Sequence, residues 1–520
     1  MNLVINTAQG YSYKPTLKPA KYPIAFQSNQ VKNNNSETNI FYVNDIHGRI
    51  GIMARIYSAK EIYDSLNKNS SADMFVLSAG DISAGADLNL INAANTFMNG
   101  IDVDVTSDGN HEYDANPSDL AKAKSNAKFK SLGMNLQIPK GNPLDGVIEK
   151  SFVAEKNGHK YAIIGLAPPD LHERIRDNES RKQIGIDDFS KTLPELQTVV
   201  DEYKKQGINR VILLSHCGLT KDQQIAKEVS GIDVIIGGHT HDLIEGIEEG
   251  KNLIYSKSGE PVIITQAGKD GEYFGNLKIT WNDKKGIIVK AQNSVSKTDS
   301  FGRNQVLQGV FDHILGKPEY LGEIKSVVAP VKNRLIEPNS HAFFIVDAMR
   351  NEFDTDIAIT NAGNIRGFFE AGPVDSRKVF EVVPLKNNMV KLKLTEKELV
   401  DALKKGAKSF NDPGSKPGLI MPSGLKYTVS KQGILKTASF IDKSGKEIPI
   451  DINNPSDKLY TVAMDDFLAS GGDGFFDNKI EQNKIDEKYD FDKDKLTCDY
   501  IRKQNQPVEI KNDGRITIID

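Results

Sequence analysis

The stretch VTSDGNHEYD, residues 105–114, crowds side chains capable of chemistry around a single glycine. These side chains are Asp108, Asn110, His111, Glu112 and Asp114. Carboxylate, amide and imidazole groups are costly to bury together unless they are paired or bound to a metal. The stretch is therefore either a loop that supplies metal ligands or a solvated turn, and the rest of the chain must decide between the two.

Four other short apolar runs are followed by aspartate or histidine residues. In an α/β sheet the ends of successive strands gather along one edge, where ligands bind. A lone histidine after a strand usually makes only a local hydrogen bond, so each motif alone is weak. Their joint occurrence favours a metal centre, whose further candidate ligands follow the runs FYV, FVLS, VILLS and VIIGG: Asp45, His47, Asp81, His216, His239 and His241.

The spacing of these residues fits two metal ions. Side chains two positions apart on an extended segment share a face, so Asp45 and His47 can hold one ion. His239 and His241 have the same spacing, although a turn could divide them between two ions. Asp81 carries two oxygens and can bridge. Mixed nitrogen and oxygen ligands suit Mn, Zn or Fe rather than a calcium site built only of oxygens.

The 520-residue chain is too long for one core, which predicts at least two domains. Residues 1–37 are polar and are interpreted as a tail or a strap on the surface. Apolar runs alternate with helical patterns over residues 38–300, which indicates an α/β domain. A helical segment is expected from about 305 within a linker at 301–335, and a second α/β domain over 336–520. The predicted strands of the first domain are residues 39–43, 73–78, 161–166, 210–215, 233–238 and 261–266.

Composition limits the partners. A net charge of −4 argues against binding to a nucleic-acid polymer, which requires a basic face. The sequence has no run of about 18 apolar residues, so no transmembrane helix is expected. The first residues show no basic start followed by an apolar core and give no export signal, which on this basis favours the cytoplasm.

The motifs NDIHGR, AGD, GNHEYD, SHCG and GGHTH, in this order, resemble the metallophosphoesterase (calcineurin-like) superfamily. Over about residues 38–500 the chain is similar to the bacterial 5′-nucleotidase family, which includes UDP-sugar hydrolases and 2′,3′-cyclic-nucleotide phosphodiesterases. The resemblance implies an α/β fold with an N-terminal four-layer αββα sandwich and a C-terminal α/β domain that recognises the nucleotide. It also implies that members are commonly periplasmic or secreted, so the location of this chain stays open.

The resemblance also implies roles for individual residues. One metal would be held by Asp45, His47, Asp81 and His241, and the other by Asp81, Asn110, His216 and His239. His111 and Asp114 would form a catalytic dyad in which the carboxylate fixes the tautomer of the imidazole, while a hydroxide bridging the metals attacks phosphorus. Asp108 and Glu112 receive no role and are expected to be a solvated turn and a helix cap.

Two stretches of the second domain resemble the substrate site of this family. ITNAGNIRG (359–367) matches the stretch NGGxIR at Asn361, Gly363 and Arg366, and DFLASGGDGF (466–475) presents Phe475 for stacking on a base, with Asp473 beside it. Leu419 stands where a second stacking aromatic is expected, and Leu385 where a phenylalanine is usual. The substrate is therefore expected to be a nucleotide held less tightly, or another phosphate ester.

The expected function is that of a phosphohydrolase with two divalent metals, acting on nucleotides as a 5′-nucleotidase does. The alternatives are a 2′,3′-cyclic-nucleotide phosphodiesterase/3′-nucleotidase or a UDP-sugar pyrophosphatase that uses the same metals. A binding module without catalysis is disfavoured, because every expected ligand position is filled. The sequence does not indicate the metal, the base or the oligomeric state.

Overall fold

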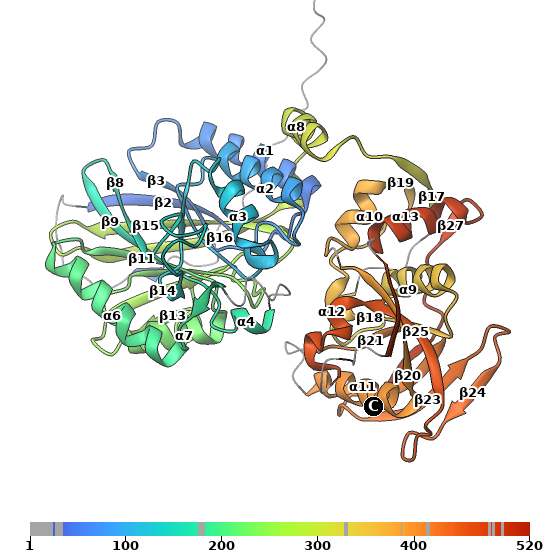
Figure 1. Cartoon of the computed structure of the whole chain (residues 1–520). Helices are drawn as coiled ribbons and strands as arrows, with labels where there is room; N and C mark the ends of the chain where they lie inside the picture. Colours follow the sequence, from blue (N-terminus) through green and yellow to red (C-terminus); the bar gives the residue numbers. More distant parts are fainter. Residues whose placement is uncertain are drawn as a thin grey trace, which may run out of the picture.

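The computed structural model describes residues 24–25, 35–174, 183–326, 331–385, 387–411, 417–476, 480, 484–489 and 493–520. The chain forms two α/β domains that lie next to each other (Figure 1). The N-terminal domain is drawn in blue through yellow-green, with α8 in yellow, and the C-terminal domain in gold to red. Among the described residues, no helix is long and apolar enough to cross a membrane.

The N-terminal domain contains two sheets packed face to face. The first has the order β1 (Ile24–Ala25), β16 (Ile287–Lys297), β15 (Tyr273–Asn282), β2 (Asn35–Val43), β3 (Asp73–Ser78), β4 (Val105–Ser107), β5 (Lys130–Leu132) and β7 (Ile148–Glu149). The second has the order β13 (Leu253–Tyr255), β14 (Pro261–Thr265), β12 (Val234–Gly237), β11 (Arg210–Ser215), β9 (His159–Leu166) and β8 (Ser151–Lys156). All six predicted strands are confirmed, and those at 73–78 and 210–215 have the predicted bounds.

Three apolar layers hold this domain together, as a four-layer sandwich requires. Large buried side chains such as Tyr161 and Trp281 fill the space between the two sheets. The outer face of the first sheet is covered by α1 (Ile50–Asn67), α2 (Leu88–Gly100) and α8 (Gln305–Leu315), and α3 (Pro117–Lys124) contacts α2. The outer face of the second is covered by α6 (Phe189–Lys205) and α7 (Leu219–Glu228). The αββα order is confirmed.

The strand directions bring many loops to one end of the sandwich. The pairs β2–β3, β3–β4 and β4–β5 are parallel, and so are β9–β11, β11–β12 and β12–β14. Parallel strands in one sheet have their carboxyl ends at the same edge. The loops after β2, β3, β4, β11 and β12, which carry the candidate ligands, are therefore close in space although they span about 200 residues of sequence.

The C-terminal domain is also a mixture of sheets and helices. Its main sheet has the order β21 (Ile420–Ser423), β18 (Ile357–Asn361), β25 (Leu459–Asp465), β20 (Met389–Thr395) and β26 (Ile485–Tyr489). A four-stranded sheet contains β24 (Glu447–Ile450), β23 (Leu435–Ile441), β22 (Leu425–Ser430) and β28 (Ile516–Ile519), and a three-stranded sheet contains β19 (Gly372–Asp375), β17 (Tyr320–Ser326) and β27 (Val508–Glu509). The helices are α9 (Ser340–Phe353), α10 (Ser376–Val382), α11 (Glu396–Ala407), α12 (Asp466–Ala469) and α13 (Lys493–Lys503).

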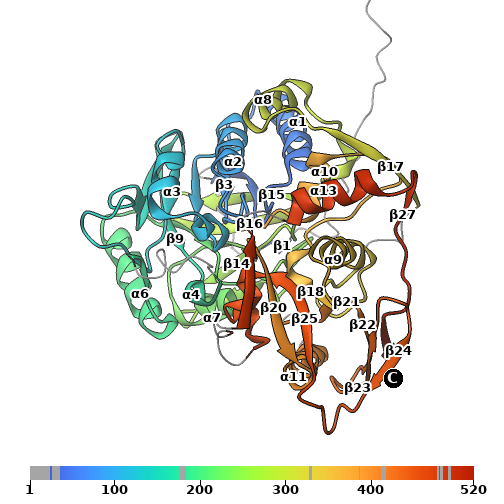
Figure 2. The same cartoon turned by 45° about the vertical axis from the view of Figure 1, so that its right-hand side comes forward.

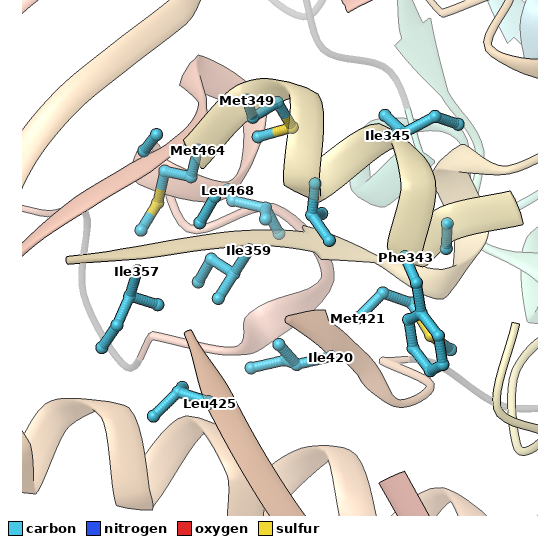
Figure 3. Packing of buried hydrophobic residues seen from close by; sticks show 14 of the residues in the cluster. Phe343, Ile345, Met349, Ile357, Ile359, Ile420, Met421, Leu425, Met464 and Leu468 are labelled. Carbon is cyan, nitrogen blue, oxygen red and sulfur yellow. The ribbon is translucent and has the colours of Figure 1, made fainter. Parts of the chain in front are cut away.

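One apolar core supports this domain. Helix α9 lies along β18, and Figure 3 shows Met349 of the helix near Met464 and Leu468. Helix α11 starts at a capping box in which Thr395 and Glu398 satisfy each other's backbone N–H groups. The core also contains Leu419, which is fully buried.

The predicted linker at 301–335 contains elements of both domains. Helix α8 packs on the N-terminal domain, where Phe311 is fully buried beside α1 and α2. The helical expectation is wrong for Tyr320–Ser326, which form β17 and pair with β19 and β27. Gly316, at φ 79°, and Pro318 both oppose continuation of the helix. We infer that the connection between the domains is residues 316–319.

The expected strap is described only in part. Ile24–Ala25 form β1 and pair with the edge strand β16. Residues 35–37 of the predicted strap belong to β2 instead, and residues 1–23 and 26–34 lie outside the described residues.

Candidate active site

The five loops bring the seven candidate metal ligands together. His241 Nε2 lies 3.3 Å from Asp45 Oδ1, and His47 Nε2 lies 3.5 Å from Asp81 Oδ2. His216 Nε2 lies 3.1 Å from the same oxygen, Asp81 Oδ2. Each of the triads Asp45–His47–His241 and Asp45–Asp81–His216 has ligand atoms within 4.8 Å of one another. Asp81 therefore lies where a bridging carboxylate would be needed.

Asn110 and His239 complete the second group. Asn110 Oδ1 lies 3.1 Å from His239 Nδ1, and the backbone N–H of His111 donates to Asp81 Oδ1 at 2.8 Å. Both side chains line the same cavity as Asp81. The geometry brings together all seven residues that the sequence singled out as ligands.

Burial and hydrogen bonding both fit metal ions at this site. The Nε2 atoms of His47 and His216 are buried and have no hydrogen-bond partner. Buried polar atoms are nearly always satisfied, so two such nitrogens directed at one carboxylate fit ligation of a cation. Oxygen and nitrogen donors of these types suit divalent cations.

The charges at the site lead to the same conclusion. Burial alone would raise the pKa of Asp81, but His216 and His111 beside it hold that pKa well below the usual value. Burial opposes protonation of His216, yet Asp81 and Asp45 raise its pKa to about 10. The two buried carboxylates thus require positive charge close by, which either protons or divalent cations supply.

The backbone of the site is unusual. Among the described residues, ten non-glycine residues have positive φ, and half of them are candidate ligands: Asp45, His47, Asp81, His239 and His241. Residues other than glycine rarely adopt this left-handed backbone conformation, and those that do cluster at functional sites. The strand ends turn sharply here, and the turns direct the side chains toward one point.

Gly109, the glycine of the stretch VTSDGNHEYD, is required by the space available at its position. A Cβ atom at Gly109 would lie 2.2 Å from Asp81 Oδ1. The backbone of the loop after β4 therefore approaches the bridging carboxylate more closely than any other residue allows.

The predicted dyad also forms. His111 Nδ1 donates to Asp114 Oδ2 at 2.7 Å within one turn of 3₁₀ helix, His111–Asp114. Gly85 N donates to the same oxygen at 2.6 Å and fixes the carboxylate. His111 Nε2 is thereby directed away from Asp114, and Arg366 Nη2 lies 3.4 Å from it.

The expectation for Asp108 and Glu112 is wrong, because neither side chain is a solvated cap. Asp108 is fully buried and accepts hydrogen bonds from Lys124 Nζ at 2.8 Å and Tyr113 OH at 3.0 Å. Glu112 accepts from the backbone N–H groups of Asp81 (2.9 Å), Ile82 (3.0 Å) and Gly109 (2.8 Å). Glu112 therefore ties the loop after β3 to the loop after β4.

A cavity of about 250 Å³ separates this site from the C-terminal domain. Four of the predicted substrate residues line it: Asn361, Gly363, Arg366 and Asp473. Asn361 Nδ2 donates to Asp473 Oδ2 at 2.5 Å, which joins the two stretches that carry them. Figure 2 shows the chain turned so that the C-terminal domain lies in front of the N-terminal one.

The structure does not bring Phe475 to the cavity. Its side chain is 1% exposed in the core of the C-terminal domain. Phe467, eight residues earlier in the same stretch, lines the cavity instead, and a Cβ atom at Gly472 would lie 2.5 Å from its ring. The interpretation of Leu419 as the replaced aromatic is also wrong, because Leu419 lies in the core while Leu385 lines the cavity.

Other residues at the site were not found from the sequence. Arg174 and Arg334 line the cavity. Burial beside Arg366 lowers the pKa of Arg334 to about 9. Asp270 Oδ1 lies 3.0 Å from His47 Nδ1, and Asp170 Oδ1 lies 3.2 Å from His239 Nε2. None of these four residues stands in a motif, so no local signal distinguishes them.

Comparisons with known proteins agree with this architecture. Residues 38–243 match the calcineurin-like phosphoesterase family, and residues 322–478 match the C-terminal domain of 5′-nucleotidases. The trifunctional nucleotide phosphoesterase protein YfkN of Bacillus subtilis is 25% identical over 92% of the chain, and the chain spans about a third (34%) of that relative's length.

Two further proteins match over most of their length. A probable 5′-nucleotidase of Treponema pallidum is 23% identical, with 78% of this chain and 79% of that protein covered. The crystal structure of a 5′-nucleotidase precursor from Thermus thermophilus superposes with a TM-score of 0.78 at 23% identity, covering 93% of this chain and 99% of that one. The chain belongs to the calcineurin-like metallophosphoesterases that carry a 5′-nucleotidase C-terminal domain.

Proposed function

We propose that this chain is a two-metal phosphohydrolase that releases phosphate from nucleotides, as a 5′-nucleotidase does. The observation that carries the proposal is one cavity with two unlike walls. The N-terminal wall holds His111 and five of the candidate ligands, with Asp45 and His216 buried behind them, and the C-terminal wall holds Arg366 and Phe467. Phosphate chemistry and base recognition then occur on opposite sides of one small substrate.

Two divalent ions fit the ligand set. We assign Asp45, His47, Asp81 and His241 to one ion, and Asp81, Asn110, His216 and His239 to the other. Bound there, the ions supply an activated water and neutralise phosphoryl charge. The mixed donors are compatible with Mn, Zn or Fe.

The chain's own groups hold and polarise the substrate. Arg366 Nη2 and His111 Nε2 lie 3.4 Å apart at the cavity, so one phosphoryl oxygen can receive hydrogen bonds from both. Asp114 holds Nδ1–H of His111, so Nε2 faces the substrate. In the imidazolium form Nε2–H can stabilise the phosphoryl group or protonate the leaving oxygen.

Two other reactions that use the same metals stay open: hydrolysis of 2′,3′-cyclic nucleotides and cleavage of UDP-sugars. The test is hydrolysis of AMP, 3′-AMP, 2′,3′-cyclic AMP, UDP-glucose and bis(p-nitrophenyl) phosphate with Mn²⁺ or Zn²⁺. The products measured are phosphate and nucleoside from the monoesters, nucleoside monophosphate from 2′,3′-cyclic AMP and UDP-glucose, and p-nitrophenol from the last substrate. We expect AMP to have the highest kcat/KM. A higher value for cyclic AMP or UDP-glucose would replace the 5′-nucleotidase assignment, and binding of metal without turnover of any substrate would indicate a binding module.

Replacement of Phe467 by alanine should raise KM for AMP about 10-fold or more. Stacking of a base on an aromatic ring contributes roughly 1–3 kcal/mol. KM for ribose 5-phosphate, which has no base, should stay nearly constant. Phe475→Leu is the matched control, because this buried ring should affect thermal stability and leave KM for AMP unchanged. The opposite pattern, with KM sensitive to Phe475 only, would restore the assignment made from the sequence.

A further inference from the structure

Asp270 lies directly behind one candidate ligand. It follows β14 in the loop at 266–272, is 5% exposed, and accepts a hydrogen bond from His47 Nδ1 at 3.0 Å. Its φ of 54° is left-handed, as in five of the ligands themselves. An aspartate in this conformation, buried against a ligand's outer nitrogen, is not explained by the fold alone.

The loop that carries Asp270 is held in place without His47. Asn44 donates from Nδ2 to the carbonyl of Gly268 at 2.9 Å and accepts at Oδ1 from Ala267 N at 2.8 Å. A Cβ atom at Gly271 would lie 2.5 Å from Ile52 of α1, so this turn packs tightly on the helix. The carboxylate is therefore a fixed point against which the imidazole can orient.

The hydrogen bond decides which nitrogen of His47 is free. Because a carboxylate accepts, Nδ1 of His47 carries the proton, and Nε2 carries the lone pair. Nε2 lies 3.5 Å from Asp81 Oδ2 and 3.8 Å from Asp45 Oδ1, and it is buried without a hydrogen-bond partner. The free lone pair is thus directed at the position assigned to the first ion.

We propose that Asp270 is a positioning residue for that ion, holding His47 in the tautomer and ring orientation that bind it. The inference rests on the proposed function, since it assumes that His47 is a ligand. His216 is held differently, because its Nδ1 donates to the backbone carbonyl of Ala79 at 2.5 Å. Asp270 is therefore a partner that mutation can remove without altering the ligand set.

The test is a calorimetric titration of the chelator-treated full chain with Mn²⁺. It compares the wild type with Asp270→Asn and Asp270→Ala. Loss of such an outer partner typically weakens metal affinity 10–100-fold. We expect a loss of this size at one of two sites in Asp270→Ala and a smaller loss in Asp270→Asn, whose amide oxygen can still accept. The Mn²⁺ concentration for half-maximal activity should rise in the same order, and excess Mn²⁺ should restore most of the rate.

Asp114→Asn is the contrasting variant. It removes the same kind of carboxylate from a histidine that we do not assign as a ligand, so its Mn²⁺ affinity should equal that of the wild type. If Asp270→Ala does not fold, the near-isosteric Asp270→Asn decides. Wild-type affinity at both sites in the folded Asp270 variants would overturn the inference and leave the proposed function standing. A wild-type chain that binds no ion would overturn both.

Discussion

Replacing Asp81 with alanine is expected to remove both metal ions and to lower kcat/KM for AMP by at least ~10⁴-fold, or about 5.5 kcal/mol. Asp81 faces candidate ligands of both groups, with His47 at 3.5 Å and His216 at 3.1 Å, and it lies closer to each of them than Asp45 does, at 3.8 Å. Without it each group lacks the shared anionic ligand that holds the ions together. Elemental analysis of the purified variant, together with phosphate release, measures both effects.

Asp45→Ala provides the comparison for this result. We assign Asp45 to one ion only, so this variant should keep about one ion per chain while Asp81→Ala keeps none. Circular dichroism checks that both variants are folded. Retention of two ions by folded Asp81→Ala would contradict the bridging role and with it the arrangement proposed for the site.

Replacing His111 with alanine should lower kcat for AMP about 10²–10⁴-fold while both ions remain bound. The imidazole faces the cavity and is held by Asp114, yet we assign it to neither ion. Asp114→Asn should cause a smaller loss, because the ring stays in place with a weaker partner. Single-turnover kinetics and elemental analysis on the same preparations separate the rate from metal content.

The choice of leaving group shows how His111 acts. If its Nε2–H protonates the leaving oxygen, His111→Ala should affect p-nitrophenyl phosphate much less than AMP, because p-nitrophenolate leaves without a proton. An equal loss for both substrates would assign His111 to stabilising phosphoryl charge instead. Loss of the ions from His111→Ala would contradict the dyad and make His111 a ligand.

The metal side of the site could be predicted from the sequence because its information is local. Each ligand comes directly after a buried strand, and buried parallel strands are recognised from short apolar runs. The strands at 73–78 and 210–215 formed with the predicted bounds, and the residues after them, from Ala79 and His216 on, enter the site. Once the strands are parallel, their carboxyl ends lie at the same edge of the sheet, which brings the ligands together.

The substrate side was harder to predict, because the direction in which a loop side chain points depends on contacts with distant parts of the chain. Phe467 and Phe475 stand in one stretch, and only the assembled fold shows that Phe467 lines the cavity while Phe475 is buried in the core. Glu112 was misread for a similar reason. The backbone N–H groups that it accepts from belong partly to a loop 30 residues away, and no sequence pattern reports that contact.

Asp270 shows the limit most clearly. It lies 223 residues from His47 in the chain, and nothing in QAGKDGE indicates that one carboxylate turns toward a metal ligand. Distance in sequence also explains the error at β17, because the partners that make it a strand, β19 and β27, lie far along the chain. Contacts of this kind come only from the assembled fold.

The left-handed backbone at five candidate ligands affects the stability of the site during storage. Each such residue disfavours the folded loop by roughly 1–2 kcal/mol relative to glycine. Without ions this backbone strain opposes the folded conformation of the loops, and coordination of the ions compensates for it. Storage with a chelator should loosen this rim first, while the buried sheets beneath it stay intact.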